Sequence, residues 1–282
     1  METQWTVRRS AEAETLMTSV ERVQQYVQLE PEPGYKLEKF APASWPQFGH
    51  IVCREVALSY VEDGPKSIDD VNFEIKAGEK VGIIGRTGAG KSSLLSALLR
   101  MPEFTGEVFV DGVSGSELNL QSYRRAFACI PQAPFLFSRT LRENLDPEQV
   151  LEDVDLWRAI EDVQMKDVVD SLQDKLDHKL SEGGSNFSAG EQQLLCLARA
   201  ILLDRKIILI DEATANVDSA TDHAVQKIIR DKFKGCTVLC IAHRLGTVKD
   251  YDRLLVFKEG KVADFGTPDV ILTGQQPANI TS

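Results

Sequence analysis

Apolar and polar positions along the chain follow two different periods, which predict strands and helices in turn. Apolar, β-branched runs typical of strands occupy residues 51–60, 71–76, 81–84, 107–110, 126–130, 206–210 and 237–241. Apolar residues recur at helical spacing over 92–100, 188–203 and 221–233, which predicts three helices. Residues 141–180 are also predicted to be mostly helical, and the apolar stripe is clearest over 155–163 and 165–172. Residues 254–257 and 261–265, joined by Glu259-Gly260, predict a terminal hairpin.

The order of these elements predicts an α/β fold. Strands that alternate with helices favour a mostly parallel sheet. The early strands follow one another without helices and predict an added antiparallel β subdomain, while the helical middle of the chain predicts a helical subdomain. We recognise no internal repeat.

The N-terminal part of the chain has a different pattern. Residues 11–29 are expected to form a helix, with an apolar stripe made by Leu16, Val20, Val23 and Val27. Two interpretations stay open: a simple amphipathic helix, or the cytoplasmic end of a longer helix that begins upstream. Prolines and a glycine end this helix, and residues 41–46 predict an extended linker. We place the boundary near Phe48, with an extension over 1–47 and a globular domain over 48–282.

Composition narrows the class of protein. At 43% hydrophobic and 27% charged residues, the 282-residue chain is typical of an ordinary globular protein. Its net charge of -11 argues against a dedicated nucleic-acid binder, because such proteins carry a basic surface. The five cysteines include no CxxC pair, so reduced thiols in a cytosolic setting are the simple expectation. No apolar run approaches the roughly 18 residues of a membrane span, so any spans must come from elsewhere.

A glycine-rich loop lies between the strand at 81–84 and the helix at 92–100. It matches the P-loop pattern G-x-x-x-x-G-K-[ST] through Gly85, Arg86, Thr87, Gly88, Ala89, Gly90, Lys91 and Ser92, and Ser93 follows. The glycines let backbone N–H groups approach phosphate oxygens, and the helix start adds its positive dipole end. We expect Lys91 to reach the β- and γ-phosphates and Ser92 to bind Mg²⁺. The loop therefore predicts a P-loop NTPase core that binds ATP.

Two acids follow the apolar strand at 206–210. Acids gain nothing in a buried strand unless they lie at its carboxyl end, where α/β proteins bind ligands. With a P-loop upstream, we expect Asp211 to hold Mg²⁺ and Glu212 to orient or deprotonate the water that attacks the γ-phosphate. Without a P-loop, two acids after a strand would be unremarkable.

A further motif begins the helix at 188–203. Ser188, Ala189, Gly190 and Glu191 follow Phe187. Ser188 fits a helix cap, and a serine–glycine helix start also fits a surface that faces a phosphate. The local pattern does not choose between these interpretations.

Taken in order, these motifs resemble the nucleotide-binding domain of ABC transporters from about residue 51 onwards. The resemblance rests on the P-loop, Gln132, the Ser-x-Gly helix start, the strand with Asp211 and Glu212, and the run Ala242-His243-Arg244. It implies that Tyr60 stacks on adenine, that Gln132 links Mg²⁺ to the membrane-coupling helices, and that His243 contacts the γ-phosphate. It also implies that Ser188 and Gly190 touch the nucleotide of a partner domain, and that residues 215–218 communicate across that dimer.

Finer details resemble the second nucleotide-binding domain of subfamily C, the multidrug-resistance-associated group, and its short members in particular. They are Asn144-Leu145-Asp146-Pro147, Gly184-Ser185-Asn186-Phe187-Ser188 and the run from Asp211 to Asp218. Residues 4–26 are similar to the cytoplasmic extension of that group's last membrane helix. By the same resemblance, residues 187–191 form the family's signature loop, which is commonly Leu-Ser-Gly-Gly-Gln. Here Phe187, Ala189 and Glu191 replace three of those residues, and the negative charge of Glu191 near a phosphate is expected to weaken binding there.

The resemblance implies an ATPase at the cytoplasmic face of a membrane, powering export of solutes such as organic anions or xenobiotics. Its implied partners are a second nucleotide-binding domain, in the same polypeptide or as a homodimer, and transmembrane domains. A regulatory nucleotide sensor of an ABC-type channel or receptor is the alternative. A DNA- or ribosome-directed ABC ATPase is disfavoured, because neither a long coiled coil nor a basic face is present.

Overall fold

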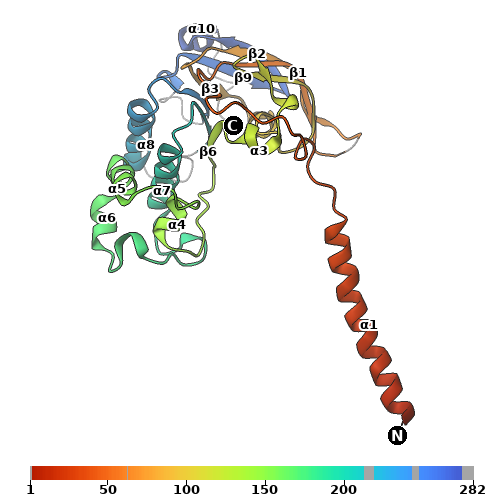
Figure 1. The fold of residues 1–282 in the computed structure, drawn as a ribbon. Coiled ribbons are helices and arrows are strands. Elements are labelled where there is room, and N and C mark those ends of the chain that lie inside the picture. Colours follow the sequence, from red (N-terminus) through yellow and green to blue (C-terminus); the bar gives the residue numbers. More distant parts are fainter. Residues whose placement is uncertain (1, 62, 213–218, 243–247, 275–282) are drawn as a thin grey trace.

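The computed structural model describes residues 2–61, 63–212, 219–242 and 248–274 (Figure 1). A long helix, α1 (Glu2–Val27), extends away from the rest of the chain in Figure 1. It is longer than the sequence predicts, and the side chains of its apolar stripe are exposed, Leu16 by 67% and Val27 by 79%. Within the described ranges, no helix combines the length and apolar character that crossing a membrane requires.

The larger sheet has six strands in the order β10-β9-β3-β8-β7-β6. Its parallel strands are β3 (Lys80–Ile84), β6 (Phe127–Ile130), β7 (Ile207–Asp211), β8 (Thr237–Ile241) and β9 (Arg253–Lys258). β10 (Lys261–Gly266) pairs antiparallel to β9 and forms the predicted terminal hairpin. This confirms a mixed, mostly parallel sheet.

A smaller antiparallel sheet has the order β2-β1-β4-β5. It consists of β1 (Ile51–Ser59), β2 (Lys66–Ile75), β4 (Phe104–Val110) and β5 (Val113–Ser114). The early strands therefore form the predicted antiparallel sheet, although β2 begins five residues before the expected strand. The two-residue strand β5 was not expected, because so short a run carries no periodicity.

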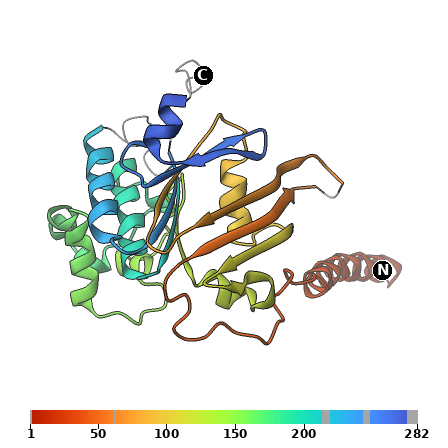
Figure 2. The ribbon, with the colours of Figure 1, turned by 90° about the horizontal axis from the view of Figure 1, so that it is seen from above.

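Both faces of the larger sheet are buried, which explains its nearly continuous apolar strands. Successive side chains of a strand point to opposite faces. Accordingly, Ile207 and Leu209 pack with α2 (Lys91–Leu98) and the smaller sheet, whereas Ile208 and Ile210 pack with the helices on the other face. Helix α2 thus lies between the two sheets, behind β1 and β2 in Figure 2.

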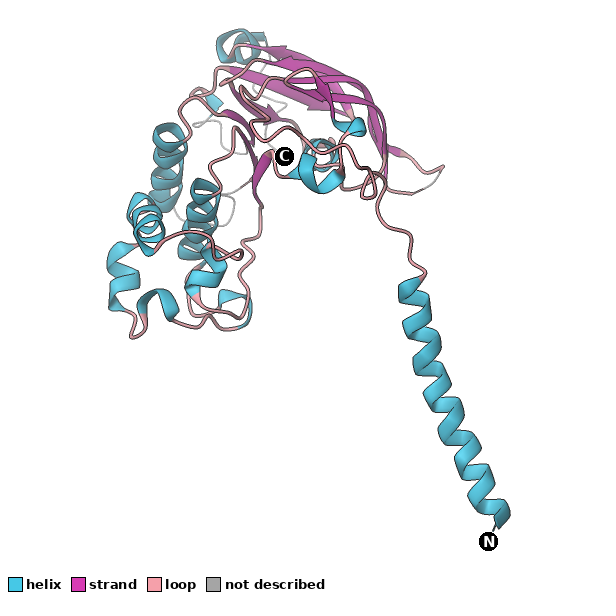
Figure 3. Ribbon diagram, in the orientation of Figure 1, coloured by secondary structure: helices cyan, strands magenta, loops and turns pink. Residues whose placement is uncertain are grey.

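Most helices gather on the other side of the larger sheet, at the left of Figure 3, and pack against it. They are α4 (Leu141–Leu145), α5 (Asp153–Asp162), α6 (Lys166–Ser171), α7 (Ala189–Leu202) and α8 (Ser219–Lys232), with short 3-10 turns at Lys175–Asp177 and Glu182–Gly184. The short helices α3 (Leu120–Arg124) and α10 (Pro268–Gly274) and the 3-10 turn Gly115–Glu117 were not predicted. The α/β fold with its antiparallel and helical additions is otherwise as the sequence predicts.

Candidate nucleotide-binding site

The P-loop joins the end of β3 to the start of α2, as expected. Its glycines adopt backbone angles that disfavour other residues: φ is 78° at Gly88 and 103° at Gly90. At Gly90 the neighbouring chain also leaves no room, because a Cβ atom there would lie 2.6 Å from the carbonyl oxygen of Ser67. The local glycine pattern therefore fixes a tight loop whose backbone leads directly into a helix N-terminus.

Lys91 is the first residue of α2 and is only 6% exposed. Its ammonium donates to the carbonyl oxygens of Gly85 and Arg86, at 2.8 and 3.1 Å, and so closes the loop on itself. Burial lowers the pKa of Lys91, and the nearby carboxylates of Glu212 and Asp211 oppose that shift. A buried ammonium with few partners is well placed to meet an anion in the loop.

The two acids lie at the carboxyl end of β7, beside the P-loop. The Ser92 hydroxyl donates to Oδ1 of Asp211 at 3.3 Å, which brings the serine and aspartate predicted to bind Mg²⁺ together. Gln132 donates from Nε2 to Oε2 of Glu212 at 3.0 Å across 80 residues of sequence. Glu212 itself has a φ of 46°, a strained backbone conformation of the kind that gathers at functional sites.

Ser92, Gln132 and Glu212 line a cavity of about 880 Å³, whereas Asp211 contacts Ser92 but is not among the lining residues. The volume suits a nucleotide-sized ligand. Its walls come from the P-loop and α2, from the polar residues after β6 and β7, from the start of β2 and from the β9–β10 turn. The lining residues are Thr87, Gly88, Gly90, Lys91, Ser92, Ser93, Gln132, Glu212, Pro65, Lys66, Ser67, Glu259 and Gly260. Gly85, Arg86 and Ala89 supply loop backbone and are not among the described lining residues. One end of the cavity, at the P-loop, is therefore suited to bind phosphates, and the other end is formed by β2 and the β9–β10 turn.

Tyr60 follows β1 and reaches the same region. Its hydroxyl donates to the Ser93 hydroxyl at 3.2 Å, and 59% of the residue is exposed. Ser93 lines the cavity. Tyr60 is not itself among the lining residues, but its exposed side chain contacts one of them and is available for a planar base to stack on.

The β9–β10 turn and the start of β2 line the cavity, although the sequence did not predict either as part of the site. Gly260 donates from its N–H to the Ala89 carbonyl oxygen at 3.0 Å, and its own carbonyl oxygen accepts from Asp69 N–H at 2.8 Å. The turn thus ties the P-loop to β2. Glu259-Gly260 was recognised only as a hairpin turn, because nothing in a turn signal shows which loop it will contact.

Ser188 and Gly190 lie apart from this cavity, at the start of α7. Ser188 caps the helix: its hydroxyl accepts from Glu191 N–H at 3.3 Å, and the Glu191 carboxylate accepts from Ser188 N–H at 2.8 Å and from the Ser188 hydroxyl at 2.7 Å. The structure therefore shows the capping interpretation directly. Contact of Ser188 and Gly190 with a phosphate on another domain stays a prediction.

Some predicted site residues lie outside the described residues. These are His243 and the run Ala215-Asn216-Val217-Asp218. Of the histidines without an assigned role, His50 pairs with Glu74 at 2.8 Å and His178 pairs with Asn186 at 3.1 Å, so both have structural partners.

Comparisons with known proteins agree with this geometry. The family model described as ABC transporter matches residues 68–215. ATP-binding cassette sub-family C member 4 of Mus musculus is 48% identical over 98% of this chain, and its Homo sapiens counterpart is 47% identical over 97%, each match covering 21% of the relative. The probable multidrug resistance-associated protein lethal(2)03659 of Drosophila melanogaster is 47% identical over 96% of this chain and 20% of its own length.

A solved structure of a bacterial Atm1-family ABC exporter with ATP bound matches with a TM-score of 0.85 at 25% identity. That match covers 93% of this chain and 46% of the exporter chain. The present chain thus spans about a fifth of the length of the curated relatives it matches. The family match, the relatives and the P-loop cavity together show that the chain belongs to the ABC transporter family, as an ATP-binding ATPase domain of the multidrug-resistance-associated group.

Proposed function

We propose that this domain binds and hydrolyses MgATP to power export of solutes, such as organic anions or xenobiotics, at the cytoplasmic face of a membrane. The observation that carries the proposal is the cavity that joins the P-loop to Gln132 and Glu212. Because the chain covers about a fifth of its relatives, transmembrane domains and a second nucleotide-binding domain would come from other segments or another copy.

The phosphates would lie against the P-loop. Backbone N–H groups and the N-terminus of α2 favour negative charge there. Lys91 now donates to two loop carbonyls and would turn to the β- and γ-phosphates, which relieves the cost of its burial. Tyr60, whose hydroxyl contacts Ser93, would stack on adenine.

Mg²⁺ fits the oxygen groups at the phosphate end. The Ser92 hydroxyl and the Asp211 carboxylate are both hard oxygen ligands, and their separation of 3.3 Å shows that they converge. These residues would hold the ion, with Gln132 beside them. When bound, Mg²⁺ neutralises charge on the β- and γ-phosphates.

Hydrolysis would use Glu212 as the group that orients water and accepts its proton. The water oxygen bonds to the γ-phosphorus, the bond to the bridging oxygen breaks, and ADP and phosphate result. Gln132 holds the Glu212 carboxylate at 3.0 Å and so positions it. We also assign His243 a contact with the γ-phosphate. Ser188 and Gly190 would approach the nucleotide of the second domain.

Substitution Glu212→Gln tests the proposal, because it preserves shape and removes the base. We expect MgATP affinity in calorimetry to stay close to that of the wild type. Turnover with a partner domain should fall about 10²- to 10⁴-fold. Near wild-type hydrolysis by the variant would remove Glu212 from the mechanism.

The same variant separates an export motor from a nucleotide sensor. In the full-length parent transporter, loss of turnover should abolish solute export. If solute export continued after hydrolysis was lost, ATP turnover would not power export. The domain would then act as a nucleotide sensor, and its assignment as an export motor would be wrong.

A further inference from the structure

Residues 30–50, here called the strap, connect α1 to β1, and they are more than a linker. The strap lies on the domain and contacts it at regular intervals. Its backbone is held by one short stretch of chain around the start of α3. The Nδ2 atom of Asn119 donates to the carbonyl oxygens of Tyr35 and Leu37, at 2.9 and 3.0 Å. The backbone N–H of Asn119 donates to the carbonyl oxygen of Lys39 at 2.7 Å. Asn119 is only 6% exposed, so these are protected hydrogen bonds.

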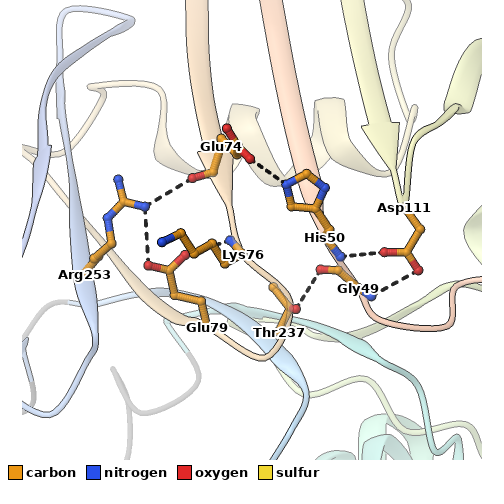
Figure 4. Close-up of polar contacts among 8 residues, drawn as sticks. All are labelled: Gly49, His50, Glu74, Lys76, Glu79, Asp111, Thr237 and Arg253. Atoms are coloured by element: carbon orange, nitrogen blue, oxygen red, sulfur yellow. Dashed lines mark hydrogen bonds and ion pairs between the residues drawn. The ribbon is translucent and has the colours of Figure 1, made fainter.

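The strap is also fixed where it enters β1. The carboxylate of Asp111 accepts from the N–H group of Phe48 at 2.8 Å. It also accepts from the N–H groups of Gly49 and His50, at 3.2 and 2.7 Å, and these two contacts are drawn in Figure 4. The hydroxyl of Thr237, which is fully buried, donates to the Gly49 carbonyl oxygen at 2.7 Å. One end of the strap is thereby attached to both sheets, and it cannot slide along the domain.

The other end of the strap is attached to the helix that follows the P-loop. Glu32 forms a two-pronged pair with Arg124, with both N–O distances 2.8 Å. Arg124 donates in turn to the carbonyl oxygens of Leu99 and Arg100, at 2.9 and 2.8 Å. These carbonyls lie directly after the last turn of α2. A carboxylate on the strap is therefore one side chain away from the C-terminal end of the P-loop helix.

A second arginine reinforces this link. Arg100 donates to the Pro33 carbonyl oxygen on the strap at 3.3 Å, and to the Gly115 and Leu118 carbonyl oxygens at 2.7 and 3.1 Å. The strap, the end of α2 and the start of α3 thus share one network of hydrogen bonds.

Helix α2 connects that network to the cavity. It has eight residues, so it is a rigid rod of about 12 Å. Its first residues are Lys91 and Ser92 at the phosphate end, and its last turn leads into the carbonyls held by Arg124. A small tilt of α2 at one end therefore moves the groups at the other. Paired arginine–carboxylate bonds depend strongly on geometry, so such a tilt alters the docking of Glu32.

We propose that the strap couples α1 to the nucleotide site: docking of Glu32 on Arg124 and binding of nucleotide at the opposite end of α2 stabilise each other. Arg124 is then a positioning residue for the P-loop helix. The inference rests on the proposed nucleotide site. It adds a route by which the segment before the domain senses occupancy of that site.

Reciprocity makes the coupling measurable from both ends. In the 282-residue chain, MgATPγS should slow amide hydrogen exchange of residues 32–41. Substitution Glu32→Gln, which cannot form the two-pronged pair, should speed that exchange and weaken MgATPγS binding in calorimetry, by about 5-fold or more. Arg124→Lys keeps the charge but loses the fork, and it should give the same two effects to a smaller extent.

Glu38→Gln is the matched control, since it removes an exposed carboxylate from the same segment, and it should match the wild type in both assays. Affinities are compared well below the unfolding temperature of every variant, so a loss of global stability does not mimic coupling. If the wild type binds MgATPγS, but its strap exchange is unchanged and Glu32→Gln binds equally well, the coupling is wrong and the nucleotide site stands. If the wild type binds no MgATPγS, both the site and the coupling fail.

Discussion

Tyr60 shows how much of a binding site depends on one exposed ring. It is held at its tip by Ser93, on the helix that follows the P-loop, and leaves more than half of its surface uncovered. An exposed ring held in place this way loses little side-chain freedom when a base stacks on it. Its contribution to binding should therefore come from the ring face rather than from the hydroxyl.

Substitution Tyr60→Ala should weaken MgATP binding about 5- to 150-fold, because base–aromatic stacking contributes roughly 1–3 kcal/mol. Tyr60→Phe keeps the ring and loses only the bond to Ser93, so its dissociation constant should stay within a few-fold of the wild type. Calorimetry on both variants measures the effect. If Tyr60→Ala binds as tightly as the wild type, adenine does not stack on this residue.

Whether the sequence predicts that a residue belongs to the site depends on how near its partners lie along the chain. Lys91 could be assigned from sequence because its loop and helix lie within ten residues of it. Asp211 and Glu212 could be assigned because strand ends meet at one edge of a parallel sheet. Lys66 and Glu259 could not, because neither the start of a strand nor a turn shows which loop it will contact. Their place in the cavity depends on a sheet-to-turn contact that no local pattern encodes.

At the scale of elements, the P-loop helix α2 is unusually constrained. It lies between two sheets and ends on carbonyls held by α3, through Arg124 and through the Tyr123 hydroxyl, which donates to the Leu98 carbonyl oxygen at 2.9 Å. The sequence predicted α2 but not α3, since five residues contain too little periodicity to register. It also predicted an extended linker over 41–46. There the Ala41 N–H donates to the Ser122 hydroxyl at 2.7 Å and the Trp45 indole donates to the Val110 carbonyl oxygen at 3.0 Å, and partners so distant in sequence leave no local pattern.

The junction of strap and β1 supplies an element-scale prediction. Gly49 has a φ of 83°, and a Cβ atom there would lie 2.9 Å from the Thr237 hydroxyl and 3.1 Å from the Lys206 carbonyl oxygen. Gly49→Ala should cost about 1–2 kcal/mol for the left-handed backbone. It should cost about 1–3 kcal/mol more for displacing a buried hydroxyl from its partners. We expect thermal unfolding to shift down by several degrees.

Gly235→Ala is the control for backbone strain alone. Gly235 has a similar φ of 77°, but a Cβ atom there meets nothing within 4 Å. The difference between the two variants isolates the close contacts of the added methyl group with Thr237 and its neighbours Lys206 and Ile207. Equal unfolding temperatures would show that the junction yields to an added methyl group without cost.

At the scale of the whole molecule, the site is divided between two regions of the domain. The P-loop cavity lies beside the larger sheet, whereas Ser188 starts α7 among the helices of the other face. Family membership predicts that such a helix start serves the nucleotide of a second domain. The sequence predicted both pieces, and they lie apart within this chain; the proposed pairing with a second domain would bring Ser188 to the nucleotide of that domain.

Pairing of two domains should depend on the charge of Glu191. Its carboxylate occupies both the N–H and the hydroxyl of Ser188, which are the donors that a γ-phosphate on a partner domain would need. An acid in the first turn also stabilises α7 by roughly 0.3–1 kcal/mol. Glu191→Gln separates these effects, because glutamine still caps the serine N–H but carries no charge. We therefore expect the variant to pair with the other nucleotide-binding domain at lower ATP concentration.

Salt supplies the decisive comparison. Repulsion between Glu191 and a phosphate is screened over a Debye length of about 8 Å at physiological ionic strength, so the advantage of Glu191→Gln should shrink as salt rises. Glu182→Gln makes the same change in net charge at an exposed position, and it should pair like the wild type. Dimerisation against ATP concentration, by sedimentation or light scattering at low and high salt, measures all three proteins. Identical pairing of Glu191→Gln and the wild type at every salt level would leave Glu191 as a helix cap alone. If Glu191→Gln pairs more readily than the wild type at low salt, but not at high salt, the charge of Glu191 weakens the contact between the start of α7 and the phosphate on the partner domain.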